Sequence, residues 1–357
     1  MWFRTAVYRP IVVQLQRSLS TAVFRAGPKK MSWPDAPRDV ASRDCFDIED
    51  GTFTNSEGHM IVTKAWIPHI SPSSWKALVF MCHGYVEHCH VPFYDILARI
   101  FVGQGCYVFS QDLVGHGRSQ GVRASIKSFD KYMADILHHV DTTRQRFSDK
   151  PVYIFGHSMG GLLAAMAVQT RPADFAGLAM MSPFLAPNKD IAPSYKKIAT
   201  RLLAKVAPTA PVGAVDVALI SRDPQVVAYM TNDPLRHRGS IPLGWVAASL
   251  RAQTECRDKA KLIEVPMFVQ VGTDDKICDV CAMKKFFEAV PSKEKTIKLY
   301  EGSYHNIFTE PDGIREQGYR DIAEWFRERL SSPREAALPP RHTEVDVGQA
   351  SGHSQAS

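Results

Sequence analysis

Short apolar runs alternate with segments that have the spacing of amphipathic helices between residues 77 and 330. Apolar runs bounded by turn residues are typical of buried strands, and apolar residues three and four positions apart are typical of helices. The predicted strands are Ala77–Cys82, Cys106–Gln111, Val152–Phe155, Gly177–Met181, Met267–Val271 and Thr296–Tyr300. The predicted helices are Phe93–Phe101, Ile126–Gln145, a segment after Ser158, Cys281–Val290 and Gly313–Leu330. This order predicts an α/β protein with a mostly parallel sheet flanked by helices.

Residues 184–255 interrupt this alternation. They contain several prolines and short helical stretches, but no convincing strand. An insertion at this position would lie above the sheet, so we predict a helical lid before the strand Met267–Val271. The chain would then consist of a basic extension over residues 1–40, a folded domain over residues 41–330, and a tail over residues 331–357 whose lack of periodicity predicts disorder.

One stretch of the predicted lid, Tyr195–Val206, has the pattern of a basic amphipathic helix. Ile198, Leu202 and Val206 share one face, and the basic residues lie elsewhere on the helix. Such helices bind in the interface of a membrane, although the apolar face could instead cover a site in the protein. We expect peripheral membrane contact through the lid. We expect no spanning helix, because no apolar run reaches ~18 residues.

Positive charge is concentrated at the N-terminus. The 357 residues carry a formal net charge of +6. Residues 1–34 contain six lysines and arginines and no acid, which leaves a net charge of zero for residues 35–357. A basic groove for nucleic acid is therefore not predicted.

The same N-terminal residues have the composition of a targeting peptide. Ile11, Leu15, Leu19 and Val23 share one helical face in a segment that is rich in arginine and free of acids. This is typical of a mitochondrial transit peptide, although a disordered tail or an interfacial helix would also fit. The seven cysteines are an odd number, which argues against a disulfide framework and for a reducing compartment. We expect an intracellular protein of the cytosol and membrane surface, with mitochondria as the alternative.

The sequence Gly156-His157-Ser158-Met159-Gly160 lies between a predicted strand and a predicted helix. Glycines on both sides of a serine at this position are typical of the nucleophile elbow of an α/β-hydrolase, which holds the serine hydroxyl clear of the backbone. The helix that follows would place its positive dipole end near the serine oxygen. We predict that Ser158 is a nucleophile.

A serine nucleophile needs a base and a group that orients the base, and in α/β-hydrolases these follow it in the order acid, then histidine. Asp274, Asp275 and Asp279 come after the strand Met267–Val271, and His305 comes after the next strand. In α/β proteins, active sites form at the edge of the sheet where the carboxyl ends of the parallel strands lie. We predict that His305 is the base and one of the three aspartates the acid, while Asp274 or Asp279 could cap the next helix.

The negative charge that develops on the substrate carbonyl oxygen needs backbone N–H donors. One donor in α/β-hydrolases belongs to the residue after the nucleophile and the other to the loop after an earlier strand. Met159 follows Ser158, and Cys82-His83-Gly84-Tyr85 follows the strand Ala77–Cys82. We therefore predict that Met159 and Tyr85 form the oxyanion hole.

Over about residues 45–330 the chain resembles the monoglyceride lipases, serine hydrolases of the α/β-hydrolase fold. The motifs that carry the resemblance are His83-Gly84 with Glu87-His88, Asp112 to Ser119 (DLVGHGRS) with Gly121, Gly156 to Gly161 (GHSMGG), Asn232-Asp233-Pro234-Leu235, Gly272-Thr273-Asp274-Asp275 and Tyr300 to His305 (YEGSYH). The resemblance implies that Ser158, Asp275 and His305 form the triad and that Tyr85 and Met159 donate to the oxyanion. It further implies hydrolysis of monoacylglycerol to fatty acid and glycerol, without a cofactor.

Two other interpretations stay open at this point. Within the enzymes, the chain could be a lysophospholipase or a broad-specificity carboxylesterase. Outside them, it could be a ligand-binding or receptor protein on a hydrolase fold, because a fold does not fix a function. The chain also departs from the family by carrying the bulky Tyr85 after His83-Gly84, where a small residue is frequent, and Met230 where a tyrosine is frequent.

Two clusters of potential ligands need a separate interpretation. Residues 87–90 (EHCH) resemble part of a metal site, but no partner with zinc spacing follows, so no metal is expected. Cys278 comes three residues after Asp275 and close to the start of a predicted helix, which would favour a thiolate. That thiol could face the substrate channel, or it could be buried.

Overall fold

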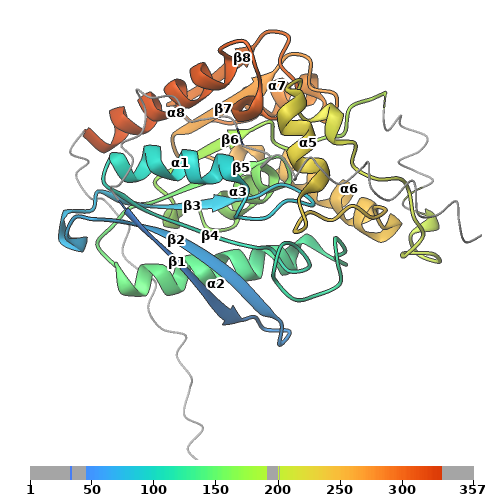
Figure 1. Ribbon diagram of the computed structural model, residues 1–357, viewed down its shortest axis with the longest axis horizontal. Coiled ribbons are helices and arrows are strands. Elements are labelled where there is room, and N and C mark those ends of the chain that lie inside the picture. Colours follow the sequence, from blue (N-terminus) through green and yellow to red (C-terminus); the bar gives the residue numbers. More distant parts are fainter. Residues whose placement is uncertain (1–32, 34–45, 191–199, 201, 332–357) are drawn as a thin grey trace, which may run out of the picture.

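The computed structural model describes residues 33, 46–190, 200 and 202–331. Its centre is one eight-stranded sheet with the order β1-β2-β4-β3-β5-β6-β7-β8 (Figure 1). The strands are β1 (Phe46–Thr54), β2 (Met60–Pro68), β3 (Ala77–Cys82), β4 (Cys106–Gln111), β5 (Val152–His157), β6 (Gly177–Met181), β7 (Met267–Gly272) and β8 (Lys295–Tyr300). β1, β2 and β4 pair antiparallel, and the other pairs are parallel. The predicted α/β-hydrolase architecture is confirmed.

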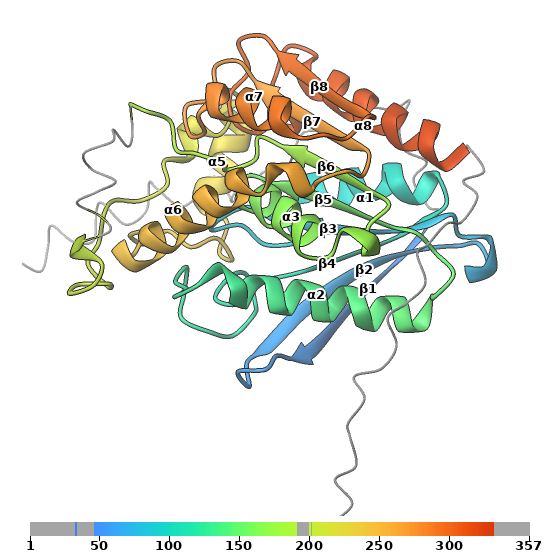
Figure 2. The ribbon, with the colours of Figure 1, turned by 180° about the vertical axis from the view of Figure 1, so that it is seen from behind.

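Helices cover both faces of the sheet, as Figures 1 and 2 show from opposite sides. One face carries α1 (Pro92–Gly103) and α8 (Ile314–Ser331), and the other carries α2 (Phe129–Arg146), α3 (Met159–Thr170) and α7 (Val280–Ala289). Because both faces are covered, every residue of β3, β4 and β5 is buried. α2 begins later than predicted because the Ser128 hydroxyl accepts a hydrogen bond from the Asp130 N–H and caps the helix there.

The segment between β6 and β7 lies at the carboxyl end of the sheet and contains α5 (Pro224–Asn232) and α6 (Leu243–Asp258). α6 is longer than the short helices expected there, and its residues Trp245, Ala248 and Ala252 pack in the main core beside α3. Half of the predicted amphipathic helix Tyr195–Val206, namely residues 195–199 and 201, lies outside the described residues. Of its apolar face, Leu202 and Val206 are described, and they are 62% and 81% exposed.

Trp33 is the described residue of the N-terminal extension. Its ring packs edge-on against Tyr229 of α5, with centroids 5.0 Å apart. Trp33 also packs against a small apolar cluster of Ile220, Val226 and Met230 in the segment above the sheet. The predicted targeting helix within residues 1–32 and the predicted disordered tail after residue 331 lie outside the described residues.

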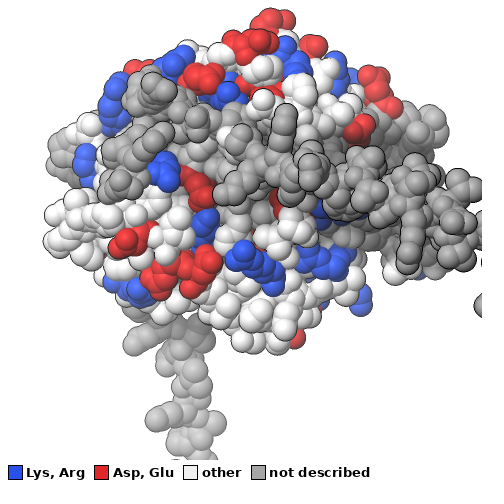
Figure 3. Space-filling view, in the orientation of Figure 1, with Lys and Arg blue, Asp and Glu red and all other residues white. Residues whose placement is uncertain are grey.

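Two observations on the described part of the chain concern membrane spans and surface charge. None of its helices combines the length and apolar character that crossing a membrane requires. On the face shown in Figure 3, basic and acidic residues are interspersed, in keeping with the zero net charge of residues 35–357.

Candidate active site

Ser158 lies at the junction of β5 and α3 in a strained backbone conformation. Its φ of 54° and ψ of −117° are rarely adopted by residues other than glycine. The turn is tight enough that a Cβ on Gly156 would lie 2.1 Å from the carbonyl oxygen of Gly160. A side chain at Gly156 is therefore excluded by the geometry, and the backbone adopts the predicted elbow.

The two residues predicted to form the oxyanion hole lie at neighbouring strand ends. β3 and β5 pair in parallel with Cys82 opposite Gly156, so Tyr85 and Met159 each come three residues beyond a paired position. The turns touch, because a Cβ on Gly160 would lie 2.1 Å from the Cys82 carbonyl oxygen. Met159 is the first residue of α3, where N–H groups have no partner within the helix.

Asp275 and His305 form a buried hydrogen-bonded pair beyond β7 and β8. His305 Nδ1 lies 2.8 Å from Asp275 Oδ2, and the side chains are 3% and 0% exposed. The other carboxylate oxygen of Asp275 accepts hydrogen bonds from the N–H groups of Ile277 and Cys278. The carboxylate is thus held from two sides, and with Nδ1 donating to it, the second ring nitrogen of His305 is left as the acceptor.

The other two aspartates have different surroundings. Asp279 caps α7 by accepting a hydrogen bond from the Ala282 N–H at 3.0 Å. Asp274 is half exposed and lies 3.6 Å from Lys276. Of the three candidates that the sequence left open, Asp275 is therefore the one that contacts His305.

The sequence left two alternatives for the Cys278 thiol, exposure to the substrate channel or burial, and the structure shows burial. The thiol is buried and lies 3.6 Å from the Ser182 carbonyl oxygen. Burial, followed by the charges of Asp275 and Asp279, raises the Cys278 pKa well above its ordinary value. The neighbouring Ile277 contributes to the pocket wall, while Cys281 is exposed.

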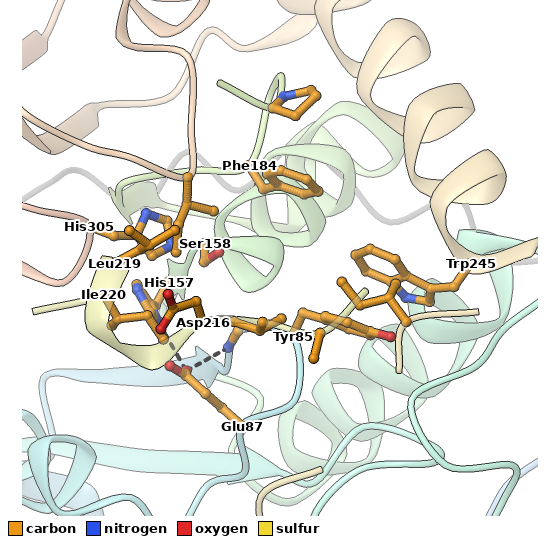
Figure 4. Close-up of a pocket in the computed structure, with 16 residues that line it drawn as sticks. Tyr85, Glu87, His157, Ser158, Phe184, Asp216, Leu219, Ile220, Trp245 and His305 are labelled. Atoms are coloured by element: carbon orange, nitrogen blue, oxygen red, sulfur yellow. Dashed lines mark hydrogen bonds and ion pairs between the residues drawn. The ribbon is translucent and has the colours of Figure 1, made fainter. Parts of the chain in front are cut away.

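Ser158 and His305 open into a pocket of about 300 Å³ beneath the segment between β6 and β7 (Figure 4). One end is aromatic, formed by Tyr85, Phe184 and Trp245. The other end, called the polar end below, contains Glu87, His157 and Asp216 beside the apolar Leu219 and Ile220 (Figure 4). Further apolar lining comes from Pro187, Ala214, Val215, Leu219, Ile220, Ile241 and Ile277.

Glu87 is the centre of the buried polar network at the second end. It accepts hydrogen bonds from the Gly84 N–H at 3.0 Å, His157 Nδ1 at 3.0 Å and the Tyr94 hydroxyl at 3.2 Å. Burial opposes ionisation, but His157, the nearby charge of Arg236 and the Gly84 N–H outweigh it and hold the Glu87 pKa well below its ordinary value. A fixed negative charge therefore lies behind the predicted oxyanion loop.

A second buried pair connects this loop to α5. His88 Nε2 lies 2.7 Å from Asp233 Oδ2, and both side chains are largely buried. Two motifs of the family resemblance, residues 87–88 and residues 232–235, are thus joined across 145 positions of sequence. Among the described residues, neither Glu87 nor His88 belongs to a group of three possible metal ligands.

Possible metal ligands do come together elsewhere in the described residues. One group comprises Cys89, His90 and Asp112, and the other comprises Asp275, Cys278 and His305. Within each group, the potential ligand atoms lie within 4.8 Å of one another. Both Asp112 oxygens already accept N–H groups, from Cys89 and Arg118. The expectation that no metal is needed stays a prediction.

Comparison with known proteins places this site in a family. A family model described as serine aminopeptidase S33 matches residues 73–312. The chain is 32% identical over 286 residues to the mouse (Mus musculus) monoglyceride lipase. This aligned region covers 80% of this chain and 92% of the mouse protein. The chain belongs to the monoglyceride lipase family. The resemblance inferred from its motifs is thereby confirmed.

Solved structures agree with this family membership. The monoacylglycerol lipase of Paleococcus ferrophilus superposes with a TM-score of 0.63 at 27% identity, covering 79% of this chain and 99% of that one. A soluble variant of the monoglyceride lipase of Saccharomyces cerevisiae, solved with a substrate analog, superposes with a TM-score of 0.70 over 84% of this chain and all of that one. At 19% identity the second comparison shows the shared fold.

Several residues of the site carried no recognisable sequence signal. Phe184, Asp216 and Trp245 come from the segment that interrupts the strand–helix alternation, where neither periodicity nor a motif marks them. Glu87 belongs to one of the family motifs, but its contact with His157, 70 positions away, depends on the neighbouring strands β3 and β5. Only the assembled sheet brings these side chains together.

Proposed function

We propose that the protein hydrolyses monoacylglycerol to a fatty acid and glycerol through an acyl-enzyme. The observation that carries this proposal is the 2.8 Å bond between His305 and Asp275 in the same pocket as the strained Ser158. The protein is a carboxylic ester hydrolase of the monoglyceride lipase family. Two of its relatives are named monoglyceride lipase and monoacylglycerol lipase, which supports monoacylglycerol as the substrate rather than a lysophospholipid or a general ester.

In the proposed first half of the reaction, Ser158 Oγ attacks the ester carbonyl carbon while His305 takes the hydroxyl proton. The N–H groups of Met159 and Tyr85 donate to the resulting oxyanion, aided by the dipole of α3. Asp275 keeps the proton of His305 on Nδ1 and stabilises the imidazolium. Collapse breaks the bond to glycerol, whose oxygen receives the proton from His305.

The second half consumes one water molecule. His305 takes a proton from the water, whose oxygen attacks the acyl carbonyl carbon. The Ser158 ester bond then breaks, Oγ recovers a proton from His305, and the fatty acid leaves. The enzyme is regenerated without any cofactor, because every proton is exchanged through His305.

The two ends of the pocket fit the two parts of the proposed substrate. The aromatic and aliphatic lining suits an acyl chain, since burial of apolar area is favourable. At the polar end, Glu87, whose pKa is held below its ordinary value, and Asp216 can accept hydrogen bonds from glycerol hydroxyls through their carboxyl oxygens. Both carboxylates would repel the phosphate of a lysophospholipid, which supports the choice of a neutral head group.

Replacement of Asp216 by asparagine tests this charge argument. Asp216 is exposed at the pocket rim, so we expect a modest change, about threefold to tenfold, in favour of lysophospholipid in the ratio of kcat/KM values. The ratio is measured by mass spectrometry with lysophosphatidylcholine and monoacylglycerol of one acyl chain. Asp149→Asn, an exposed change outside the pocket lining, is the control. An unchanged ratio in Asp216→Asn would contradict this role.

Peripheral membrane contact through the lid is part of the proposal. Leu202 and Val206 belong to the segment between β6 and β7 and expose most of their apolar surface. Residues that insert into a membrane interface have such exposed apolar side chains. Sedimentation with phosphatidylcholine vesicles should carry the protein down. The double variant Leu202→Glu, Val206→Glu should remain in the supernatant, and equal sedimentation of both proteins would contradict this contact.

We further propose an intracellular location, with residues 1–34 as a targeting segment. Its six positive charges and lack of acids support this proposal. Fusion of residues 1–34 to a fluorescent reporter should direct it to mitochondria, and a diffuse cytosolic signal would contradict the targeting role. A protein that starts at Met31 keeps Trp33 against Tyr229 and should hydrolyse a soluble ester at the normal rate.

A further inference from the structure

Residues 219–223 lead into α5 and form part of the pocket lining; we call them the pre-α5 segment. Leu219 and Ile220 line the pocket, and Figure 4 shows both beside His305. The pre-α5 segment contacts residues 303–310, which contain His305 and which we call the histidine loop. Each of residues 220, 221 and 222 makes a hydrogen bond to this loop. A part of the pocket lining is thus joined to the chain that carries the proposed base.

The backbone on each side of His305 is held by a hydrogen bond. The Asn306 N–H donates to the carbonyl oxygen of Ile220 at 2.9 Å. The Tyr304 N–H donates to the carboxylate of Glu310, whose Oε2 lies 3.1 Å away. The backbone of His305 therefore takes its position from the pre-α5 segment on one side and from Glu310 on the other.

Glu310 connects the histidine loop to the pre-α5 segment a second time. It is fully buried, and its Oε1 accepts the backbone N–H of Arg222 at 2.8 Å. Its Oε2, which accepts the Tyr304 N–H, also accepts Arg222 Nε at 2.7 Å. The Ser221 hydroxyl adds a hydrogen bond to the Thr309 carbonyl oxygen at 2.8 Å. Because a buried carboxylate that loses its partners is costly, this network holds the two segments in one relative position.

The position of the His305 backbone decides whether the imidazole reaches the serine. A base has to lie within about 2.6–3.2 Å of the hydroxyl whose proton it takes. The hydrogen bond to Asp275 orients the ring of His305, but it does not by itself fix the backbone from which the ring extends. A displacement of about 1 Å can lower a rate about 10²-fold, even when its cause lies far from the reacting atoms.

We propose that Glu310 and Arg222 are positioning residues for His305 and that they couple the position of the pocket lining to the position of the base. This inference rests on the proposed ester hydrolysis through Ser158 and His305 and adds two residues to it. Neither side chain belongs to the described pocket lining, so both act through the histidine loop. Displacement of the pre-α5 segment would move His305 away from Ser158.

The first test replaces Glu310 by glutamine in the full-length protein. The amide has one acceptor oxygen, so its NH₂ group has to face either the Arg222 N–H or the donors at Oε2, and one connection is lost. With p-nitrophenyl butyrate, a soluble ester, kcat should fall about 10²-fold while KM changes by less than about threefold.

Arg222→Gln is the second variant, and its combination with Glu310→Gln tests the coupling. Arg222→Gln keeps the backbone N–H of residue 222 on Glu310 and removes the side-chain contact, so kcat should fall less, by about tenfold. Because both residues act through one contact, the double variant should lose no more than about the 10²-fold of Glu310→Gln alone.

The proton on His305 Nδ1, held in the 2.8 Å hydrogen bond to Asp275, gives a readout that does not depend on turnover. Such a bond moves the proton resonance downfield in the NMR spectrum, and in folded Glu310→Gln we expect this resonance to shift or to broaden. The matched control is Asp174→Asn, which breaks the 2.6 Å ion pair to Arg144 of α2, where the side chains are 20% and 22% exposed. It should lower the melting temperature and leave both the resonance and kcat unchanged.

The outcomes separate this inference from the function on which it rests. A kcat within about twofold of wild type in folded Glu310→Gln and Arg222→Gln would overturn it, as would losses that multiply in the double variant. If Glu310→Gln does not fold, Arg222→Gln decides, because its side chain is partly exposed. Wild-type protein that neither cleaves the ester nor reacts with a fluorophosphonate would instead reject the hydrolase. The resonance would then still show whether Glu310 and Arg222 hold His305.

Discussion

Replacement of Ser158 by alanine is expected to lower kcat for monoacylglycerol by about 10⁴–10⁶. Without Oγ no acyl-enzyme forms, and only the oxyanion donors and the binding pocket remain to assist attack by water. The loss is measured by release of fatty acid under single-turnover and steady-state conditions. Covalent labelling by a fluorophosphonate should disappear in the same variant.

The control for this experiment is Ser110→Ala. Ser110 is fully buried in β4 and donates a hydrogen bond to the Met81 carbonyl oxygen, away from the pocket. Its loss should lower the melting temperature while leaving the labelled fraction of folded protein unchanged. A Ser158→Ala protein that turns over at nearly the wild-type rate would end the acyl-enzyme proposal. Wild-type protein that binds lipid but never reacts with the fluorophosphonate would favour a non-catalytic binding protein.

Elements buried on both faces were predicted with the smallest errors. β3, β4 and β6 have the bounds that their apolar runs indicate, because each run ends at a turn residue or a polar motif. β1 and β2 were missed. β1 contains the acidic stretch Asp47–Asp50 and exposes most of its residues at the edge of the sheet. Its strand conformation comes from pairing with β2, which a local apolar pattern does not reveal.

The parts of the site that could be predicted depend on residues close together in the sequence, and the parts that could not be predicted depend on residues far apart. The elbow at Ser158 needs only a few consecutive residues, because the strained turn and its glycines are local. The pocket wall needs Tyr85 and Trp245, 160 positions apart, and the polar end needs Glu87 and His157. The sequence left the surroundings of Cys278 open, because only the assembled fold shows that burial and the charge of Asp275 raise its pKa beside a helix start.

Replacement of Asp275 by asparagine is expected to lower kcat by about 10⁴ while leaving the fold intact. The amide can still accept the N–H groups of Ile277 and Cys278 through its oxygen. Its NH₂ group would then face His305 Nδ1, which must become the acceptor. The proton of the imidazole moves to the other nitrogen, and that nitrogen can no longer take the proton of Ser158.

Parallel asparagine variants of Asp274 and Asp279 distinguish this mechanism from a general loss of negative charge. Asp279→Asn weakens the cap of α7 and should cost at most about 1 kcal/mol of folding free energy, with kcat nearly unchanged. Asp274→Asn removes an exposed charge beside Lys276 and should have a smaller effect still. The three are compared by kcat on folded protein and by thermal unfolding. An inactive Asp279→Asn beside an active Asp275→Asn would show that another carboxylate orients His305, and the 2.8 Å contact would then have no catalytic role.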